Sequence, residues 1–513
     1  MRLSGSARSL ITRFVITALA LASPALALAQ NAQQEAGAPA VPPAQAVPGV
    51  GSPGAALPGV MTPGTQMPGE AATDLGAPPG NLTRYGIAAG IGETDNVNLS
   101  SADPKSQTLA AANLDFDLRR TGSRLDASAL GTFTDLDYVQ GAYGNQLLGR
   151  FDGLATVKLW SDRLKWEFAD NYGEEQTDPF ASITPVNLQR VNVFSTGPDL
   201  TLRPSYSTFV DLGAHYSQIN YETSPFSGHN LLGSAEFGRE LSPLSTLSVV
   251  VHVEQLRFDN TVVNTDYDRR EAYGRYFIQG ARTSIDAQLG ATQANDVGSS
   301  WKTSPLVRLR LTRRISPFSL ITLAGGREYT DAAGAFSSMS SGAGGGILVA
   351  PVTQTSANYV RNYGSAGWEF MRERTALAFT GNWEHDAYDF QTVFNVTRED
   401  VGINLGRSLT PQLALNISGT ADRYQYVNQG YTDEFGTIGG GVSYRPGRWF
   451  IIYARYDHAF RRASGVPTVL FGQSGYDENR VFVMVGYRPH SEDMEPGAAP
   501  GTGSPGFSGP SVP

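Results

Sequence analysis

Residues 307–319, V-R-L-R-L-T-R-R-I-S-P-F-S, contain the pattern that decides the fold. Apolar and polar residues alternate through the first six positions, and a turn containing Arg and Pro follows at Arg313 to Ser319. Successive side chains of a β-strand point to opposite faces, so this alternation predicts a strand with one apolar and one polar face. The turn is short enough to lead directly into a second strand.

The same unit recurs from Tyr85 to Tyr487. Nine short turns join alternating runs in pairs: Arg119 to Arg124, Trp160 to Leu164, Leu202 to Ser207, Glu240 to Ser245, Gln279 to Ser284, Arg313 to Ser319, Phe370 to Thr375, Arg407 to Leu413 and Tyr444 to Trp449. Their centres recur about every 40 residues, the length of a long β-hairpin with its outer loop. Longer polar loops join one hairpin to the next. This alternation of short and long connections is typical of a barrel whose two rims face different compartments.

The turns also set the expected number of strands. Period-two alternation predicts twenty strands, and eighteen or sixteen remain possible if weak runs such as Ser284 to Thr292 are not strands. An even number leaves both ends of the barrel on the short-turn side, which in bacterial barrels is the periplasm. We therefore expect an all-β fold, a transmembrane antiparallel up-and-down β-barrel over residues 81–490.

The polar face indicates which side of the sheet meets water. It carries charges of both signs that would be costly to bury in a packed core. They are Asp115, Asp117, Lys158, Lys165, Glu167, Asp211, Glu254, Arg275, Arg308, Arg310, Glu384 and Arg455. A soluble barrel of this size would instead have to fill a wide interior with apolar side chains. We therefore expect the polar face to line a wet lumen and the apolar face to meet lipid.

Composition supports one repetitive body with tails. Charged residues are 17% of the chain, glycine reaches 57 residues, and beyond the N-terminus no apolar stretch approaches the length of a membrane helix. There is no cysteine, which excludes disulfides and thiolate metal sites. The net charge of −9 and the lack of a basic run make nucleic acid an unsuitable partner.

The two ends of the chain differ from the repetitive region. Residues 1–29 have a positive start, an apolar middle and an Ala27-Leu28-Ala29 cleavage pattern, which predicts a secretory signal peptide. Residues 30–80 are rich in Ala, Pro and Gly, with Pro-Gly every five residues from Pro48 to Pro68, and residues 491–513 are similar. Such segments are expected to be disordered. Residues 30–80 are either a simple periplasmic tether or a docking strip for periplasmic partners or peptidoglycan.

The two rims differ in charge. Arginine lies in or next to all nine short turns, whereas the longer loops carry acidic residues such as Asp95, Glu174, Asp259 and Asp433. Two interpretations remain open. Either the charged residues only keep the turns and loops solvated by water, or the acidic loops bind divalent cations that bridge an anionic lipid surface.

No group of residues predicts catalysis or cofactor binding. The six histidines are scattered, and there is no HExxH, GxSxG or phosphate-binding glycine motif. An adjacent pair, His385-Asp386, offers one weak hypothesis of water activation at a strand end. No catalytic, cofactor-binding or metal-binding residue is assigned, and no cofactor is expected. The long Ser/Gly-rich loop from Asp331 to Tyr359 is either a surface whisker or a flap folded into the lumen.

Two short motifs resemble a known family. Gly92 to Ser100, G-E-T-D-N-V-N-L-S, follows the first strand, and Asn192 to Pro198, N-V-F-S-T-G-P, begins another. Both resemble segments of a family of outer-membrane β-barrel porins associated with exopolysaccharide secretion and exosortase-type protein sorting. The sequence departs from many outer-membrane barrels in one respect, because about two dozen residues follow the aromatic Tyr487 that would otherwise end the chain.

This resemblance implies a wide aqueous conduit for exopolysaccharide export in the outer membrane. We expect Lys158, Trp160, Arg308, Arg310, Trp449, Tyr453 and Arg455 to line the pore. The partners would be outer-membrane lipid and lipopolysaccharide, the polysaccharide, and a periplasmic export apparatus. The alternatives are a structural or adhesive outer-membrane barrel without transport, and an outer-membrane hydrolase. The oligomeric state stays open.

Overall fold

The computed structural model describes residues 82–160, 163–177, 182–262, 264–296, 300–330, 349–350, 357–389, 392–465 and 475–489. Every described residue belongs to the unit Ser52–Pro513. The expected signal peptide, the Pro-Gly segment, the C-terminal tail and most of the loop from Asp331 to Tyr359 lie outside the described residues.

The described residues form long strands, one after another. The first ten are β1 (Leu82–Thr94), β2 (Gln107–Thr121), β3 (Leu125–Tyr138), β4 (Gln146–Trp160), β5 (Leu164–Gln176), β6 (Leu188–Ser205), β7 (Thr208–Tyr221), β8 (Gly228–Ser242), β9 (Ser245–Phe258) and β10 (Tyr267–Gln279). The others are β11 (Thr283–Asp296), β12 (Lys302–Ser316), β13 (Ser319–Thr330), β14 (Val349–Ala350), β15 (Tyr359–Arg372), β16 (Thr375–Tyr388), β17 (Val396–Ser408), β18 (Leu413–Tyr426), β19 (Tyr431–Tyr444), β20 (Phe450–Ser464) and β21 (Tyr476–Tyr487). Short 3₁₀ helices, η2 (Pro185–Asn187), η3 (Thr392–Phe394) and η4 (Val427–Gln429), lie in the connections.

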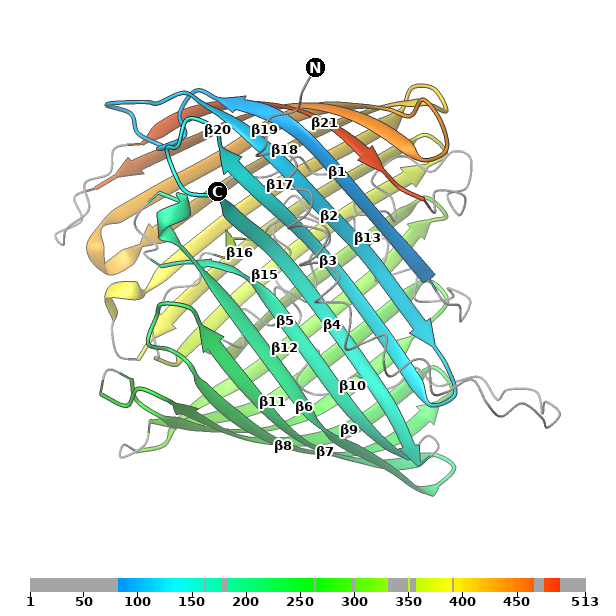
Figure 1. Ribbon diagram of the computed structural model, residues 1–513. Helices are drawn as coiled ribbons and strands as arrows, with labels where there is room; N and C mark the ends of the chain where they lie inside the picture. The colour runs from blue at the N-terminus through cyan, green and yellow to red at the C-terminus, as the bar shows by residue number, and fades with distance from the viewer. Residues whose placement is uncertain are drawn as a thin grey trace. The chain divides into compact units, whose positions relative to one another are not determined.

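All these strands belong to one 21-stranded sheet. Apart from the two-residue β14, each strand pairs antiparallel with its neighbours in sequence, and β1 pairs with β21 from Ile87 opposite Tyr487 to Thr94 opposite Arg480. The remaining twenty strands therefore close into an up-and-down barrel (Figure 1), as predicted. The run treated as weak in the sequence is a full strand, β11. Since the strand number is even, Leu82 and Tyr487 lie at the same rim as the short turns.

The strand β14 departs from this order. It belongs to the connection between β13 and β15, yet it pairs in parallel with Glu174 and Glu175 of β5, a strand that is no neighbour of either in the barrel. This strand belongs to the loop from Asp331 to Tyr359, which the sequence predicts to be either a surface whisker or a flap folded into the lumen. Residues 331–348 and 351–356 lie outside the described residues.

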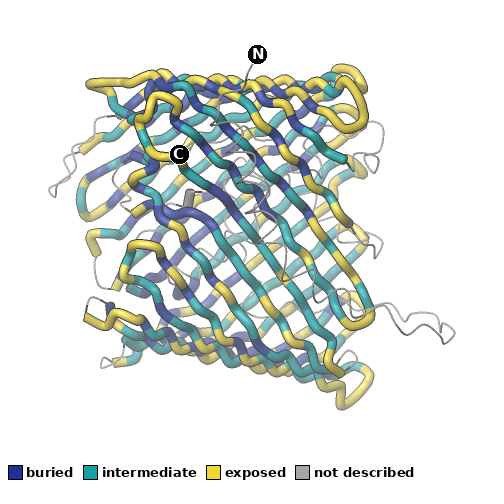
Figure 2. The backbone as a smooth tube through the Cα atoms, in the orientation of Figure 1, coloured by how far each residue is buried: buried dark blue, intermediate teal, exposed yellow. Residues whose placement is uncertain are grey.

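Exposure alternates along the barrel strands (Figure 2). On β9, Val249 is 59% exposed and Val253 is 43% exposed, whereas Val250 is 2% and Glu254 is 6% exposed. The exposed set is apolar and the covered set includes charges, so the apolar face points outward to lipid and the polar face points to the interior. We use the word row for a set of residues that lie directly opposite one another on successive strands. A row is inward when its side chains point to the barrel interior and outward when they point to lipid.

Glycine makes barrel closure possible at the seam between β1 and β21. A Cβ atom on Gly90 would overlap the carbonyl oxygen of Val483, and one on Gly92 would overlap the ring of Phe482. Both glycines lie on inward rows opposite large side chains of β21, Met484 and Phe482. Only residues without side chains allow the two strands to pair here.

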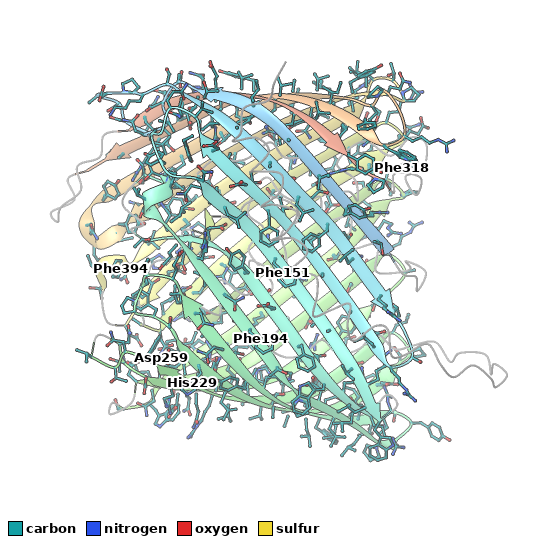
Figure 3. The ribbon with its side chains drawn as sticks, viewed as in Figure 1. Phe151, Phe194, His229, Asp259, Phe318 and Phe394 are labelled. Atoms are coloured by element: carbon teal, nitrogen blue, oxygen red, sulfur yellow. The ribbon has the colours of Figure 1, made fainter. Side chains whose placement is uncertain are left out.

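Aromatic side chains cover other glycines on the outer face. The Phe116 ring lies over Gly131, and the Phe133 ring lies over Gly149. These two rings stack with their centroids 6.3 Å apart, and Phe151 also approaches Phe116 at 6.3 Å. Figure 3 shows Phe151 on β4 and Phe194 on β6 among the outer side chains. Flat rings lying over cross-strand glycines give this part of the wall a smooth apolar surface.

Candidate functional site

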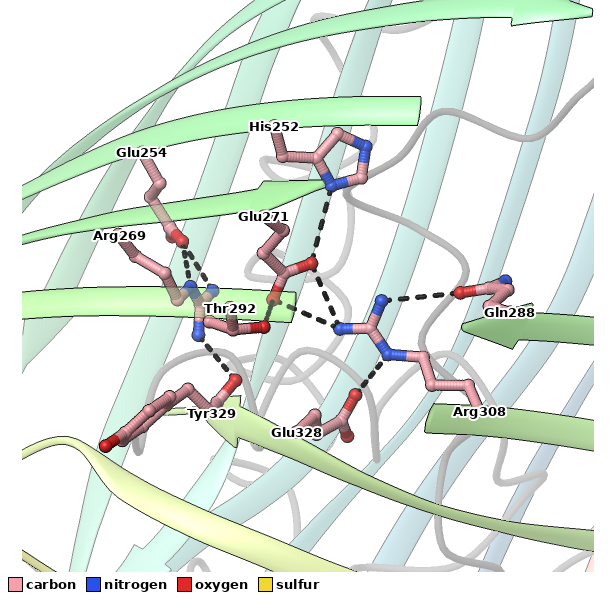
Figure 4. A network of polar contacts seen from close by, with 9 residues as sticks. All are labelled: His252, Glu254, Arg269, Glu271, Gln288, Thr292, Arg308, Glu328 and Tyr329. Carbon is pink, nitrogen blue, oxygen red and sulfur yellow. Dashed lines mark hydrogen bonds and ion pairs between the residues drawn. The ribbon is translucent and has the colours of Figure 1, made fainter. Parts of the chain in front are cut away.

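The candidate site is the inner wall of the barrel, where side chains from many strands meet. Arg308 on β12 joins several of these side chains (Figure 4). Its Nη2 atom donates to Glu271 Oε2 at 3.2 Å, its Nε atom pairs with Glu328, and its Nη1 atom donates to Gln288 at 3.4 Å. Because Arg308 is only 7% exposed, these carboxylates compensate a charge that would otherwise be costly to cover.

The same network extends to β9. His252 Nδ1 lies 3.7 Å from Glu271, and Arg269 Nε donates to Glu254 at 2.7 Å. Arg269 also donates to the carbonyl oxygen of Tyr329 at 2.9 Å, which ties β10 to the end of β13 (Figure 4). His252 and Glu254 lie two residues apart on the inner face, but they have different partners and do not form a site with each other.

A second network lies on β15, β16 and β17. Arg361 Nε donates to Glu384 at 3.0 Å, and Arg398 bridges Glu384 and Asp386 at 3.1 Å each. Arg361 is 1% exposed and Asp386 is 0% exposed. Two guanidinium groups therefore face two carboxylates, so this part of the inner wall is locally neutral.

Further pairs extend the pattern around the wall. On β20, Arg461 Nε donates to Asp433 at 2.9 Å and Arg455 contacts Asp457 at 2.6 Å. Similar pairs lie on the early strands, namely Arg150 with Asp152 at 2.8 Å, Lys158 with Asp126 at 2.6 Å, and His215 with Asp199 at 3.0 Å. Ion pairs thus neutralise many of the charges on the inner wall.

One inward row carries charges that have no ion pair with a described residue, although its Asp286 is paired with Arg275 at 2.6 Å. It crosses β11 to β18 at Asp286, Arg310, Ala324, Ser365, Asn382, Asp400 and Asp422. Arg310 is exposed, and within the described residues it has no ion pair. Asp400 accepts a hydrogen bond from Asn382 at 2.6 Å, while Asp422 makes no hydrogen bond or ion pair with another described residue. Small side chains at Ala324 and Ser365 separate the positive and the negative part of this row, which we call the open row.

The expected pore-lining residues fall into two groups. Lys158, Arg308, Arg310, Tyr453 and Arg455 lie on inward rows. Trp160 does not, because a bulge after Lys158 brings it opposite Leu164, where it is 57% exposed with Arg163 over its ring. Trp449 lies in the turn before β20, with its ring edge-on to Tyr487 of an outward row. Whether the first group borders an open pore stays a prediction.

Sequence reasoning missed several inner-wall residues, including Glu271, Glu328, Arg361 and Arg461. Each lies on the polar side of an alternating strand, so its face was predictable. The partner of each residue was not predictable, because the pairs join adjacent or next-but-one strands and depend on their register.

The pair His385-Asp386 does not form a catalytic site. Adjacent strand residues point to opposite faces, so His385 lies on an outward row with Nδ1 2.9 Å from Thr397, while Asp386 points inward to Arg398. In the described part of the chain, no group of three or more His, Cys, Asp or Glu residues is arranged to hold a metal ion.

At the short-turn rim, arginines cluster as the sequence suggested. Arg488 donates to Asp115 at 3.3 Å. Burial lowers the pKa of Arg445, in the turn before β20, and the positive charge of Arg488 lowers it further. The guanidinium nevertheless stays charged in water at neutral pH, because its ordinary pKa is so high.

Comparisons with known proteins give only distant similarity. No family model and no curated protein matches the sequence. Among solved structures, the siderophore receptor PirA from Acinetobacter baumannii is 9% identical with a TM-score of 0.44, over 80% of this chain and 81% of that chain. PirA from Pseudomonas aeruginosa is 11% identical with a TM-score of 0.39, over 80% and 81%. The FrpB iron transporter from Neisseria meningitidis (F3-3 variant) is 8% identical with a TM-score of 0.38, over 79% and 81%. No helix among the described residues is long and apolar enough to cross a membrane.

Proposed function

We propose that this chain is an outer-membrane β-barrel that forms an aqueous conduit. The observation that carries the proposal is the division of its wall into an apolar outward face and a charged inward face with an exposed Arg310. Charges of both signs facing a packed apolar interior would be costly, whereas water in a lumen solvates them. The short-turn rim, where both ends of the barrel lie, would face the periplasm.

The cargo that we propose is a polysaccharide, as the sequence resemblance implies. A polymer of sugars offers hydroxyl groups that both donate and accept hydrogen bonds. The open row presents one guanidinium, one amide and three carboxylates, of which Asp286 is paired with Arg275. Many weak contacts of this kind let a chain move, because no single contact holds it strongly. A periplasmic export apparatus would deliver the polymer to the short-turn rim.

Planar-bilayer recording of the purified protein tests this proposal. We expect discrete conductance steps, and a reversible decrease in current when a neutral polysaccharide is added on the short-turn side. Arg310→Ala should weaken this block, because it removes a donor from the open row. Absence of conductance steps from protein that has folded into the bilayer would overturn the conduit.

A structural barrel without transport is the second candidate. It is favoured by the covered ion pairs, since Arg361, Arg461 and Asp386 are each at most 1% exposed. The same recordings separate the two candidates, because a structural barrel would insert without conducting.

A further inference from the structure

The outer wall carries a hollow of about 760 Å³ across β15 to β20, and Ala324 of β13 also lines it. Two consecutive outward rows border it. The upper row, nearer the long loops, holds Gly364, Trp383, Glu399, Arg423 and Glu434. The lower row holds Ala366, Gly381, Val401 and Ala421, and reaches Phe460.

The composition of this lining places the hollow outside the barrel. Only one inward row contributes to it, the open row, which lies between the two outward rows and contributes Ala324, Ser365, Asn382, Asp400 and Asp422. A hollow on the inner face would need side chains from several inward rows as walls. A hollow on the outer face needs two outward rows and the backbone between them. The hollow is therefore a groove in the lipid-facing surface, which we call the outer groove.

The floor of the groove is open because its residues are small. A Cβ atom placed on Gly364 would meet nothing within 4 Å, and one on Gly381 would meet its nearest atoms only at 4.0 Å. Trp383 and Val401 stand beside this floor and are 45% and 59% exposed. The groove crosses five inter-strand steps, which corresponds to about 24 Å at the usual strand spacing.

The two sides of the groove differ in polarity. In the upper row, Arg423 lies 3.6 Å from Glu399 and 3.6 Å from Glu434, and all three side chains are about half exposed. The lower row is apolar, and the next outward row toward the short turns continues with Phe379, Ile403 and Ile438. The groove therefore follows the boundary between the headgroup layer and the hydrocarbon layer.

We propose that the outer groove binds one lipid of the lipopolysaccharide class, with an acyl chain over the small residues of the floor and a phosphorylated headgroup at the upper row. Arg423 pairs with a lipid phosphate, and Glu399 and Glu434 hold the divalent cations that bridge neighbouring phosphates. This inference rests on the proposed outer-membrane location, since the upper row then lies in the outer leaflet.

The charges of the upper row favour a lipid of the lipopolysaccharide class. Two carboxylates around one guanidinium repel a bare polyanion, but they match a phosphate layer that contains divalent cations. A second copy of the chain is a poorer fit, because a groove only two residue rows wide buries far less area than a stable interface needs.

Two substitutions with matched controls test the proposal. Gly364→Leu fills the groove where there is open space, and Gly274→Leu fills an outward position on β10 where a Cβ atom would find its nearest neighbours only at 4.0 Å. Arg423→Gln removes the central cation, and Arg190→Gln changes the outward Arg190–Glu222 pair, which is also 3.6 Å apart and half exposed. Each variant is mixed with purified lipopolysaccharide or phosphatidylethanolamine, with Mg²⁺ or EDTA. Native mass spectrometry counts retained lipid, and a heat-modifiability gel confirms folding.

We expect the unchanged protein to retain one lipopolysaccharide in Mg²⁺, with retention about tenfold lower for Gly364→Leu, for Arg423→Gln and in EDTA, and unchanged for both controls. Equal retention by the groove variants and their controls would overturn the site, and so would retention of phosphatidylethanolamine in preference. Conductance of the same variants is measured separately. A barrel that conducts but binds no lipid contradicts only this inference, whereas one that binds lipid but never conducts contradicts the conduit.

Discussion

At the scale of single residues, Arg308 and Arg310 show how position determines the role of a charge. They lie two residues apart on β12 and share the inward face. Arg308 is enclosed by Glu271 and Glu328, whereas Arg310 is exposed and has no ion pair among the described residues. The sequence predicted the face of both. It did not distinguish them, because the partners of Arg308 come from β10 and β13.

Arg308→Met should destabilise the barrel. The substitution leaves Glu271 and Glu328 covered without their cation, and removing one member of a buried ion pair typically costs about 3–5 kcal/mol. Urea unfolding in lipid vesicles measures this change. Arg310→Met is the matched control, with an expected change below about 0.5 kcal/mol because an exposed unpaired residue is removed. Equal destabilisation by the two variants would show that the network does not contribute.

Arg310→Glu should change ion selectivity without changing stability. It replaces the exposed positive charge by a negative one in the row that also holds Asp286, Asp400 and Asp422, so cations should be favoured more strongly. The reversal potential under a KCl gradient measures the shift. Arg372→Glu, in the last position of β15 at a short turn, is the control for a charge change outside the open row. Identical reversal potentials for both variants would place Arg310 away from the ion path.

At the scale of strands and turns, the sequence predicted most of the structure. Alternation and the nine turns gave the twenty strands, their faces and the rim at which both barrel ends lie. Local irregularities were not predictable. The bulge before Trp160 turns that residue out of the inward set, and Trp449 lies in a turn, although simple alternation placed both inside. The pairing of β14 with β5 was also not predictable, because it joins residues far apart in sequence.

Gly90→Leu should prevent barrel closure. Its side chain would overlap the backbone of β21, so the pairing of β1 with β21 could not form at this position. We expect loss of the heat-modifiable band on a gel and rapid proteolysis. The control is Gly364→Leu, which introduces the same side chain at an outward glycine with no atom within 4 Å of the added Cβ. A folded, protease-resistant Gly90→Leu protein would mean that the seam is not constrained as described.

At the scale of the whole molecule, the period-two alternation of apolar and polar residues determines which face of the wall carries charges and meets water, and which face meets lipid. The barrel and the sense of its two faces were predictable from the sequence, because a strand period of two assigns every residue to a face. The outer groove and the open row were not. Both depend on which residue each small residue meets across the strands: Gly364 lies opposite Trp383, and Ala324 lies opposite Ser365.

Cysteine scanning of β18 tests the central claim, that the polar face lines water and the apolar face meets lipid. The chain has no cysteine of its own, so each introduced thiol is a single reporter. In a bilayer, a charged, membrane-impermeant maleimide should label cysteines at Asn416, Ser418 and Thr420, which are inward, and should spare those at Leu415, Ile417 and Ala421, which are outward. A lipid-soluble maleimide should give the opposite pattern. Labelling without this alternation, or with its sense reversed, would contradict the assignment of the inner face to an aqueous lumen.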